Sequence, residues 1–233
     1  MRISLRQSSK LIVILAFCGS LAAQTAELQT IRLPKPQMDG GKPLMQVLRD
    51  RKSARAFSGR KLSEQVLSNL TWAAFGINRP DGRRTAPSAS NRQEVEIYVV
   101  TPEGAYLYDA KEHVLAPVAA GDFRAQAGTQ GYVKDAPVNL VFVADTAKMG
   151  KGSDEQKALI YGADTGFISQ NAYLYCTSEG LATVVRASVD REALAKVLKL
   201  RPEEKIAILF SWPFRKTVAS IRCGWQVVRA TTF

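Results

Sequence analysis

Residues 135–145 read DAPVNLVFVAD, and nearly all of residues 138–144 are apolar. An apolar run of strand length, without the alternation of a half-exposed strand, is typical of a strand that is covered on both faces. We therefore predict that residues 138–144 form a central strand, and we expect the flanking segments to build a sheet around it.

Strand signals precede this run. Residues 95–100 (VEIYVV) are rich in β-branched residues, and residues 105–109 and 114–118 follow as a predicted hairpin. Residues 120–130 are interpreted as a helix. Residues 77–94 contain Pro, Gly, Asn and Ser, which predicts a loop.

Helical spacing of apolar residues marks three further segments. A helix is predicted from Pro43, and another begins after Ser63, a favourable N-cap. A long helix is predicted over residues 156–179, and Gly180 provides its C-terminal stop. The core residues expected from the long helix are Leu159, Ile160, Ala163, Phe167, Ala172 and Leu174.

The end of the chain continues with a short helix over residues 190–198 and a strand over residues 206–210. No internal repeat or linker interrupts the pattern, so we predict one α+β domain over residues 43–233. Residues 24–42 mix Pro, Gly and charged residues without periodicity, which predicts an extended arm that leads into the domain.

Residues 1–23 are typical of a secretory signal peptide. Three basic residues lie within residues 2–10, and residues 11–23 (LIVILAFCGSLAA) are apolar and end in small residues. Cleavage after Ala23 would yield an exported protein, periplasmic or secreted, with no stable membrane insertion. A membrane anchor is the alternative, although spanning a bilayer needs roughly 20 apolar residues. A lipoprotein signal at Cys18 is disfavoured by the bulky residue before it.

The chain of 233 residues carries a formal charge of +11, which falls to +8 without the three basic residues of the signal peptide. This excess favours an anionic partner such as a phosphate-bearing cofactor, an acidic substrate or a polyanion, although it also serves solubility. Nucleic-acid binding is not expected, because the basic residues are scattered and no aromatic strip accompanies them. Cys176 and Cys223 remain after cleavage and could pair in an oxidising compartment.

The residue types present argue against catalysis by the protein's side chains alone. His113 is the only histidine and lies in the predicted hairpin, and the chain has no GxSxG sequence for a hydrolase. It also has no HExxH sequence and no Cys/His spacing of a zinc site. Residues 150–153 (GKGS) lack the upstream glycine of a P-loop. A cofactor that brings its own reactivity is therefore favoured.

Two basic, hydroxyl-bearing segments are candidates for binding such a cofactor. Residues 51–57 (RKSARAF) place Arg51, Ser53 and Arg55 at alternate positions, so these side chains point the same way if the segment is extended. Such a cluster can hold a phosphate through charge-assisted hydrogen bonds. Residues 86–93 (APSASNRQ) offer short hydroxyls and amides to a polyol or a heterocycle. Each segment alone also occurs by chance on solvated surfaces.

In their order along the chain, these segments resemble the nitroreductase family. Members carry an RRSxRxF-like segment at the end of a helix and then a PSSxNxQ-like loop before a strand. The similarity covers roughly residues 43–210. It includes residues 135–145, the long helix with Asp164, Gly166, Gln170 and Asn171, the turn SEGLATV at 178–184, and residues 190–209. The resemblance implies a homodimer whose central, mostly antiparallel sheet is flanked by helices.

The resemblance also implies a site for flavin mononucleotide (FMN). The residues that match contacts to the phosphate, ribityl chain and pyrimidine edge are Arg51, Ser53 and Arg55, with Lys52 among them. The residues that match the loop approaching the flavin from the other subunit are Pro87, Ser88, Ala89 and Asn91. The turn whose backbone lies beside flavin N5 matches Gly180, Leu181 and Ala182. Ala89 replaces a frequent serine, and Ala182 replaces a frequent glycine and narrows the approach to N5 by one methyl.

The last part of the chain departs from the family. Members have a strand of small residues that ends near Gly-Tyr-Pro, followed by basic residues that reach the phosphate, whereas residues 210–214 read FSWPF here. Arg215 is the candidate for the phosphate-binding base.

The resemblance implies a ping-pong oxidoreductase. NAD(P)H would deliver hydride to flavin N5, and an electron-poor small molecule such as a nitroaromatic or a quinone would then take the electrons. Because an exported enzyme meets little NAD(P)H, a redox partner is the alternative donor. Relatives in the family instead oxidise azoline rings in peptides, remove iodine from iodotyrosine or cleave flavin. The second interpretation is an exported basic flavin- or anion-binding protein with little turnover.

Overall fold

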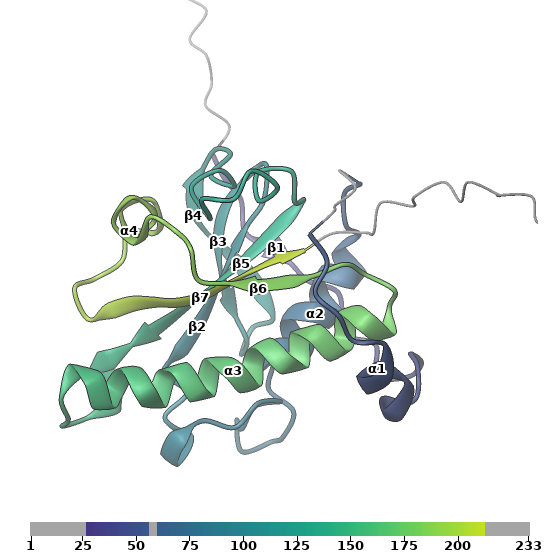
Figure 1. Cartoon of the computed structure of the whole chain (residues 1–233), viewed down its shortest axis with the longest axis horizontal. Coiled ribbons are helices and arrows are strands. Elements are labelled where there is room, and N and C mark those ends of the chain that lie inside the picture. Colours follow the sequence, from purple (N-terminus) through teal and green to yellow (C-terminus); the bar gives the residue numbers. More distant parts are fainter. Residues whose placement is uncertain (1–26, 56–59, 213–233) are drawn as a thin grey trace, which may run out of the picture.

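The computed structural model describes residues 27–55 and 60–212 (Figure 1). The expected signal peptide, the end of the RKSARAF segment, Arg215 and Cys223 lie outside the described residues. Within the described ranges, no helix combines the length and the apolar character that crossing a membrane requires.

Within the described residues, seven strands form one sheet. They are β1 Ile31–Arg32, β2 Val95–Val100, β3 Gly104–Asp109, β4 Val114–Ala120, β5 Val138–Asp145, β6 Val184–Arg186 and β7 Glu204–Trp212. Their order across the sheet is β1-β4-β3-β2-β5-β7-β6, and every strand is antiparallel to its neighbours. The α+β prediction and the expected antiparallel sheet are confirmed.

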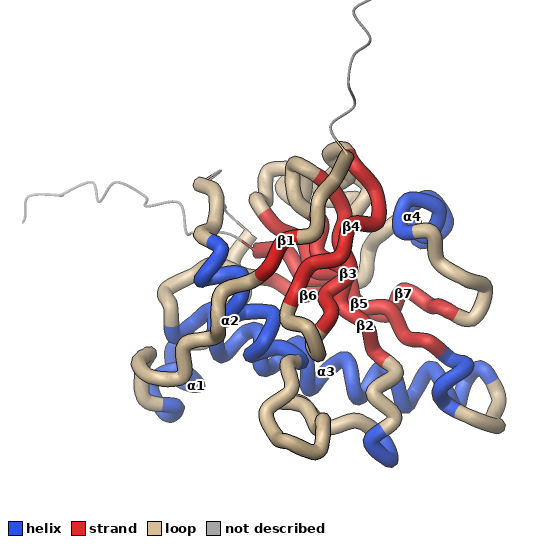
Figure 2. The backbone as a smooth tube through the Cα atoms, turned by 180° about the vertical axis from the view of Figure 1, so that it is seen from behind, coloured by secondary structure: helices blue, strands red, loops and turns tan. Residues whose placement is uncertain are grey.

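Four α-helices in the described ranges accompany the sheet. They are α1 Leu44–Asp50, α2 Glu64–Phe75, α3 Asp154–Ser178 and α4 Arg191–Leu198. Figure 1 shows α2 and α3 on one side of the sheet and α4 on the other, and Figure 2 shows the same arrangement from behind. The short α1 lies near the C-terminal end of α3.

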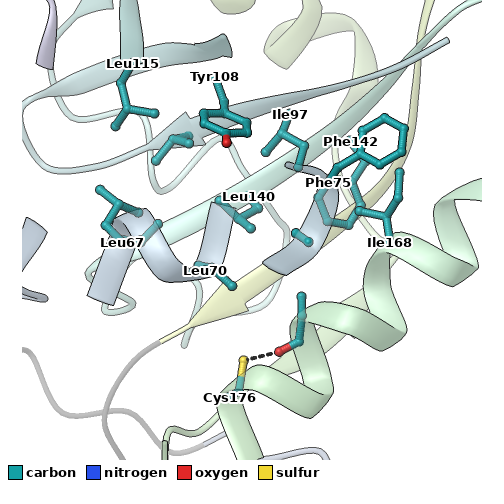
Figure 3. Packing of buried hydrophobic residues seen from close by; sticks show 14 of the residues in the cluster. Leu67, Leu70, Phe75, Ile97, Tyr108, Leu115, Leu140, Phe142, Ile168 and Cys176 are labelled. Atoms are coloured by element: carbon teal, nitrogen blue, oxygen red, sulfur yellow. Dashed lines mark hydrogen bonds between the residues drawn. The ribbon is translucent and has the colours of Figure 1, made fainter. Parts of the chain in front are cut away.

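The strand predicted to be central, β5, is internal and buried along its whole length between β2 and β7. Its side chains alternate between the two faces. Leu140 and Phe142 belong to the cluster under α2 and α3, which Figure 3 shows, whereas Val141 and Val143 belong to the cluster under α4. The double coverage expected from the apolar run is therefore present.

Local capping explains where the helices begin and end. The Ser63 side chain accepts a hydrogen bond from the Val66 amide at 3.3 Å and begins α2, as predicted. At the other end of α3, Gly180 adopts φ +70°, and the Leu181 amide donates to the Cys176 carbonyl at 2.7 Å. This is the glycine-dependent helix stop that the sequence predicted.

Residues 120–130 were predicted to be helical, and this was wrong. Gly121 has φ +123°, and the Asp122 carboxylate binds the backbone and guanidinium of Arg124, which favours turns over a helix. The segment instead covers one face of the sheet, where Ala127 is fully buried and Phe123 packs against the same cluster.

The core prediction for the long helix was also wrong in part. Leu159 and Phe167 are 77% and 50% exposed, respectively, and Ala163 is exposed as well. The face that packs against the sheet carries Ile168, Ala172 and Cys176. Both faces of α3 contain apolar residues, so periodicity alone could not tell which face is inward.

His113 has a structural place, as expected from its position in the hairpin. Its ring lies 2.7 Å from the Ser68 hydroxyl and 3.0 Å from the Tyr108 hydroxyl. Burial lowers the pKa of His113. The histidine thereby links the hairpin to α2.

Candidate functional site

The basic segment 51–55 is extended and lies along the edge strand of the sheet. The Ala54 amide donates a hydrogen bond of 2.8 Å to the carbonyl of Thr183, the residue directly before β6. The Arg51 amide donates to the Val47 carbonyl at 2.8 Å and ties the segment to the end of α1. Two segments that are far apart in the sequence, 51–55 and 180–184, are thus side by side.

The side chain of Tyr173 on α3 connects these two segments. Its hydroxyl lies 2.8 Å from the Ser53 hydroxyl and accepts a hydrogen bond of 2.9 Å from the Val185 amide. The guanidinium of Arg51 lies over the same ring, 5.2 Å from its centroid. Sequence reasoning did not identify Tyr173, because no local signal distinguishes it from other helical aromatic residues.

The segment concentrates positive charge that the protein does not neutralise. Lys52 and Arg55 are exposed and Arg51 is half-buried, and none of the three forms an ion pair within the described part of the chain. The adjacent Asp50 is engaged by Arg49 at 2.9 Å, and that hydrogen bond lowers the pKa of Asp50. Cationic side chains that form no ion pair among the described residues can bind a phosphate or another anion.

The turn 180–182 follows α3 and leads into β6. Leu181 and Ala182 are both buried. The methyl of Ala182 lies in a small cluster with Ala136 and Val184, against which Ala54 packs. Within one chain, the Ala182 methyl therefore contacts other apolar side chains. The turn itself connects the end of α3 to the start of β6.

The loop 86–93 contains a short 3₁₀ helix over Ala89–Asn91 and three non-glycine residues with positive φ, namely Ser90, Asn91 and Gln93. Such a conformation is costly for residues with a side chain, so hydrogen bonds must hold it. The Ala89 amide donates to Asp164 Oδ2 at 2.9 Å, and the Gln93 amide donates to Ser88 Oγ at 2.9 Å.

In one chain, this loop is separated from segment 51–55. Asp164, which anchors the loop, precedes Tyr173 by nine residues on α3. A helix rises 1.5 Å per residue, so the two anchor points are about 13 Å apart along the axis. The structure brings together two of the three predicted parts of the site, 51–55 and 180–182. The loop with Pro87, Ser88, Ala89 and Asn91 is instead anchored to an earlier part of α3, through Asp164.

A buried acidic pair lies under the loop, and sequence reasoning missed it. Glu94 is fully buried, Asp164 is 4% exposed, and no hydrogen-bond partner for either Glu94 carboxylate oxygen is found among the described residues. Burial, together with the neighbouring Asp164, raises the pKa of Glu94 to about 7. The only local signal was an acidic residue directly before an apolar strand.

Three cavities among the described residues lie away from the predicted site. The largest, about 700 Å³, lies between the first half of α3, α4 and the start of β7, and its lining includes Tyr161 and Arg191. None of the three is lined by residues 51–55, 86–92 or 180–182. These three cavities therefore do not coincide with the candidate site.

These features can be compared with known proteins. The model of the nitroreductase family matches residues 48–211. The chain belongs to the nitroreductase family. This confirms the resemblance and makes the chain a member of a family of oxidoreductases.

Individual relatives agree with the assignment to the nitroreductase family. A candidate nitroreductase of Methanocaldococcus jannaschii is 29% identical over 183 residues, which are 74% of this chain and 91% of that protein. The crystal structure of a candidate nitroreductase from Ralstonia eutropha JMP134 has a TM-score of 0.77 and 38% identity, covering 81% of this chain and 90% of that one. A chain of the E. coli microcin synthetase McbBCD complex has a TM-score of 0.62 and 18% identity, covering 89% and 85%, and shares the fold.

Proposed function

We propose that this chain is an FMN-dependent oxidoreductase that moves electrons from NAD(P)H or another donor to an electron-poor small molecule, such as a nitroaromatic or a quinone. One observation carries the proposal. The cationic segment 51–55 has no internal ion pairs within the described residues, and it lies beside the turn 180–182 that follows α3. Membership of the nitroreductase family supports the redox chemistry.

The positive charges and hydrogen-bond donors of segment 51–55 fit the phosphate end of FMN. Arg51, Lys52 and Arg55 supply positive charge, and the exposed Ser53 supplies a hydroxyl. The backbone of 180–182 would lie against the flavin ring. Arg215 stays a candidate for a further phosphate contact. Bound FMN would supply the electron transfer itself, by taking up and releasing a hydride equivalent.

The protein's own residues bind, orient and stabilise charge. Arg51 is held over Tyr173, so its guanidinium starts from a restricted position. The exposed Arg55 favours negative charge on a reduced cofactor. No side-chain acid or base is required for hydride exchange, which agrees with the single histidine being engaged in a structural contact.

We further propose that the site is completed in a homodimer. The exposed apolar residues Leu159 and Phe167 on α3, and Leu44, Met45 and Leu48 on α1, are typical of a surface that is covered by another chain. A second copy would bring its loop 86–93 to segment 51–55.

The proposed location is outside the cytoplasm, after cleavage at Ala23. The motivating observation is the charged and then apolar character of residues 1–23. Expression of the full-length chain in a bacterial host, followed by fractionation and N-terminal sequencing, tests it. We expect a mature chain that begins at Gln24 in the periplasmic or extracellular fraction. Retention of the intact N-terminus in the cytoplasm would contradict export.

The function is tested on the purified mature protein. We expect absorbance bands of oxidised flavin at about 370 and 450 nm, either as isolated or after addition of FMN. Under anaerobic conditions, NADH or NADPH should bleach the band, and a nitroaromatic or quinone should restore it. A colourless protein that does not take up FMN would overturn the proposal.

The same experiment distinguishes the flavin-binding protein with little turnover. Such a protein would take up FMN, but its bound flavin, once reduced and freed of excess dithionite, would pass electrons to a quinone or nitroaromatic no faster than free reduced FMN does. If the bound reduced flavin reacts much faster than free reduced FMN and nicotinamide does not reduce it, the donor is another molecule and the oxidoreductase assignment stands.

A further inference from the structure

Tyr173 occupies the boundary between the core and the cationic segment. It is 8% exposed, and its ring belongs to the cluster of buried residues under α2 and α3. Its hydroxyl reaches the opposite side of that cluster, where segment 51–55 meets β6. The residue therefore joins the rigid part of the fold to a segment that has no regular secondary structure.

Within the part of the chain that the structure describes, few other hydrogen bonds hold segment 51–55. Its backbone is held by the bond from the Arg51 amide to Val47 and the bond from the Ala54 amide to Thr183. Between these bonds, the Ser53 side chain is fixed by Tyr173 at 2.8 Å. A loosened Ser53 would thus remove the side-chain hydrogen bond that fixes the middle of the segment.

The two contacts of the hydroxyl reinforce each other. The tyrosine oxygen accepts the Val185 amide of the edge strand and is also paired with Ser53. One atom therefore sets the position of Ser53 relative to β6 and to the turn before it. The ring below adds a cation–π contact to Arg51, whose flexible side chain would otherwise sample many rotamers.

We propose that Tyr173 is a positioning residue for the anion-binding segment, holding Ser53 through its hydroxyl and Arg51 through its ring. This inference rests on the proposed function, and it adds a residue of α3 to a site otherwise built from a segment, a loop and a turn. Tyr173 acts through Ser53 and Arg51.

The test compares Tyr173→Phe with Tyr161→Phe in the mature full-length protein. Tyr173→Phe removes the hydroxyl and keeps the ring in the core. Tyr161 lies on the same helix and lines the 700 Å³ cavity, away from the segment, so its variant controls for loss of a helical hydroxyl. Both variants should unfold near the temperature of the wild type.

The first readout needs no cofactor. Hydrogen–deuterium exchange on the flavin-free protein should show the Ala54 amide exchanging about tenfold faster in Tyr173→Phe and unchanged in Tyr161→Phe. The acceptor of this amide, the Thr183 carbonyl, is untouched by the substitution, so faster exchange reports a loosened segment. An unchanged rate overturns the inference whatever the protein binds.

The second readout is the dissociation constant of FMN and of riboflavin, which lacks the phosphate. We expect Tyr173→Phe to raise the constant for FMN about three- to tenfold, as loss of a hydrogen-bonded anchor does, and that for riboflavin less than twofold. In a Ser53→Ala background the same substitution should have little further effect, because the coupling is already lost. Equal weakening of both ligands means a general structural role and overturns the inference.

The two proposals fail in different ways. Wild-type protein that binds neither FMN nor riboflavin overturns the proposed function, and the role of Tyr173 towards FMN falls with it. Wild-type protein that binds FMN, with a Tyr173→Phe variant of unchanged affinity, overturns only the positioning role.

Discussion

The Ala89 amide donates a hydrogen bond of 2.9 Å to the Oδ2 atom of Asp164, and this contact joins the loop 86–93 to α3. The loop carries positive φ at Ser90, Asn91 and Gln93, so it needs an external anchor to keep its shape. Asp164 itself is buried next to Glu94. The Asp164 side chain thus anchors the loop, and this position also places two carboxyl groups together.

Replacing this anchor should loosen the loop. Asp164→Ala removes this hydrogen bond but also relieves Glu94 of its acidic neighbour, so we expect a net loss of about 1–2 kcal/mol in the free energy of unfolding. Brief digestion with trypsin under native conditions should cut after Arg92 several-fold faster than in the wild type. Cleavage after Lys199, in the turn that follows α4 on the other side of the sheet, serves as the internal control. An unaltered rate after Arg92 would show that the loop does not depend on Asp164.

The buried Glu94 should make stability depend on pH. Its folded-state pKa is raised to about 7 from an ordinary value of 4.5, so the folded state binds more protons between these values than the unfolded state does. Stability from this group is full below about pH 4.5 and is lost as the pH rises through 7. We expect Glu94→Gln to remove this decline, on the order of 2 kcal/mol between pH 5 and pH 8.

Urea unfolding of the wild type and Glu94→Gln at both pH values measures this effect. The control is Glu203→Gln, at an exposed carboxyl, which should keep the pH dependence of the wild type. If the free energy of unfolding changed with pH by the same amount in the wild type and in Glu94→Gln, the assignment of a raised pKa to Glu94 would be contradicted.

Arg51 should contribute to FMN affinity. Arg51→Ala removes a charge-assisted contact, which costs about 1.5–3 kcal/mol, or roughly 10- to 150-fold in the dissociation constant. Arg49→Ala removes the same charge two residues away, at a side chain that is 72% exposed and paired with Asp50, and should change affinity little. Quenching of flavin fluorescence measures both. Equal affinities in the two variants would mean that the segment does not hold the phosphate.

The exposed face of α3 should be part of the dimer contact. Phe167→Glu places a charge on an apolar surface position, so we expect dissociation to monomers together with weaker FMN binding. Ala125→Glu adds the same charge at an exposed turn on the face of the sheet covered by α4 and should leave the dimer intact. Light scattering coupled to size-exclusion chromatography gives the mass. A dimer that survives Phe167→Glu would place the interface elsewhere.

Local sequence signals were sufficient for most of the fold. The apolar run at 138–144 predicted an internal strand, and the Ser63 cap and the Gly180 stop predicted the start of α2 and the end of α3. These features depend on a few neighbouring residues, because a cap or a helix stop is satisfied within one turn. The segments 51–57 and 86–93 were recognised for the same reason, since their residue types are adjacent in the chain.

Tertiary structure alone decided which parts meet. That Tyr173 would join Ser53 to β6, that Glu94 would lie beside Asp164, and that Phe167 would face outward depend on contacts between residues far apart in the sequence. A residue's own neighbours carry no information about such partners, because the free energy of burial and of long-range hydrogen bonds is set by the packed assembly. The sequence by itself therefore determined the elements and the chemistry they carry, and packing determined which of them share a site.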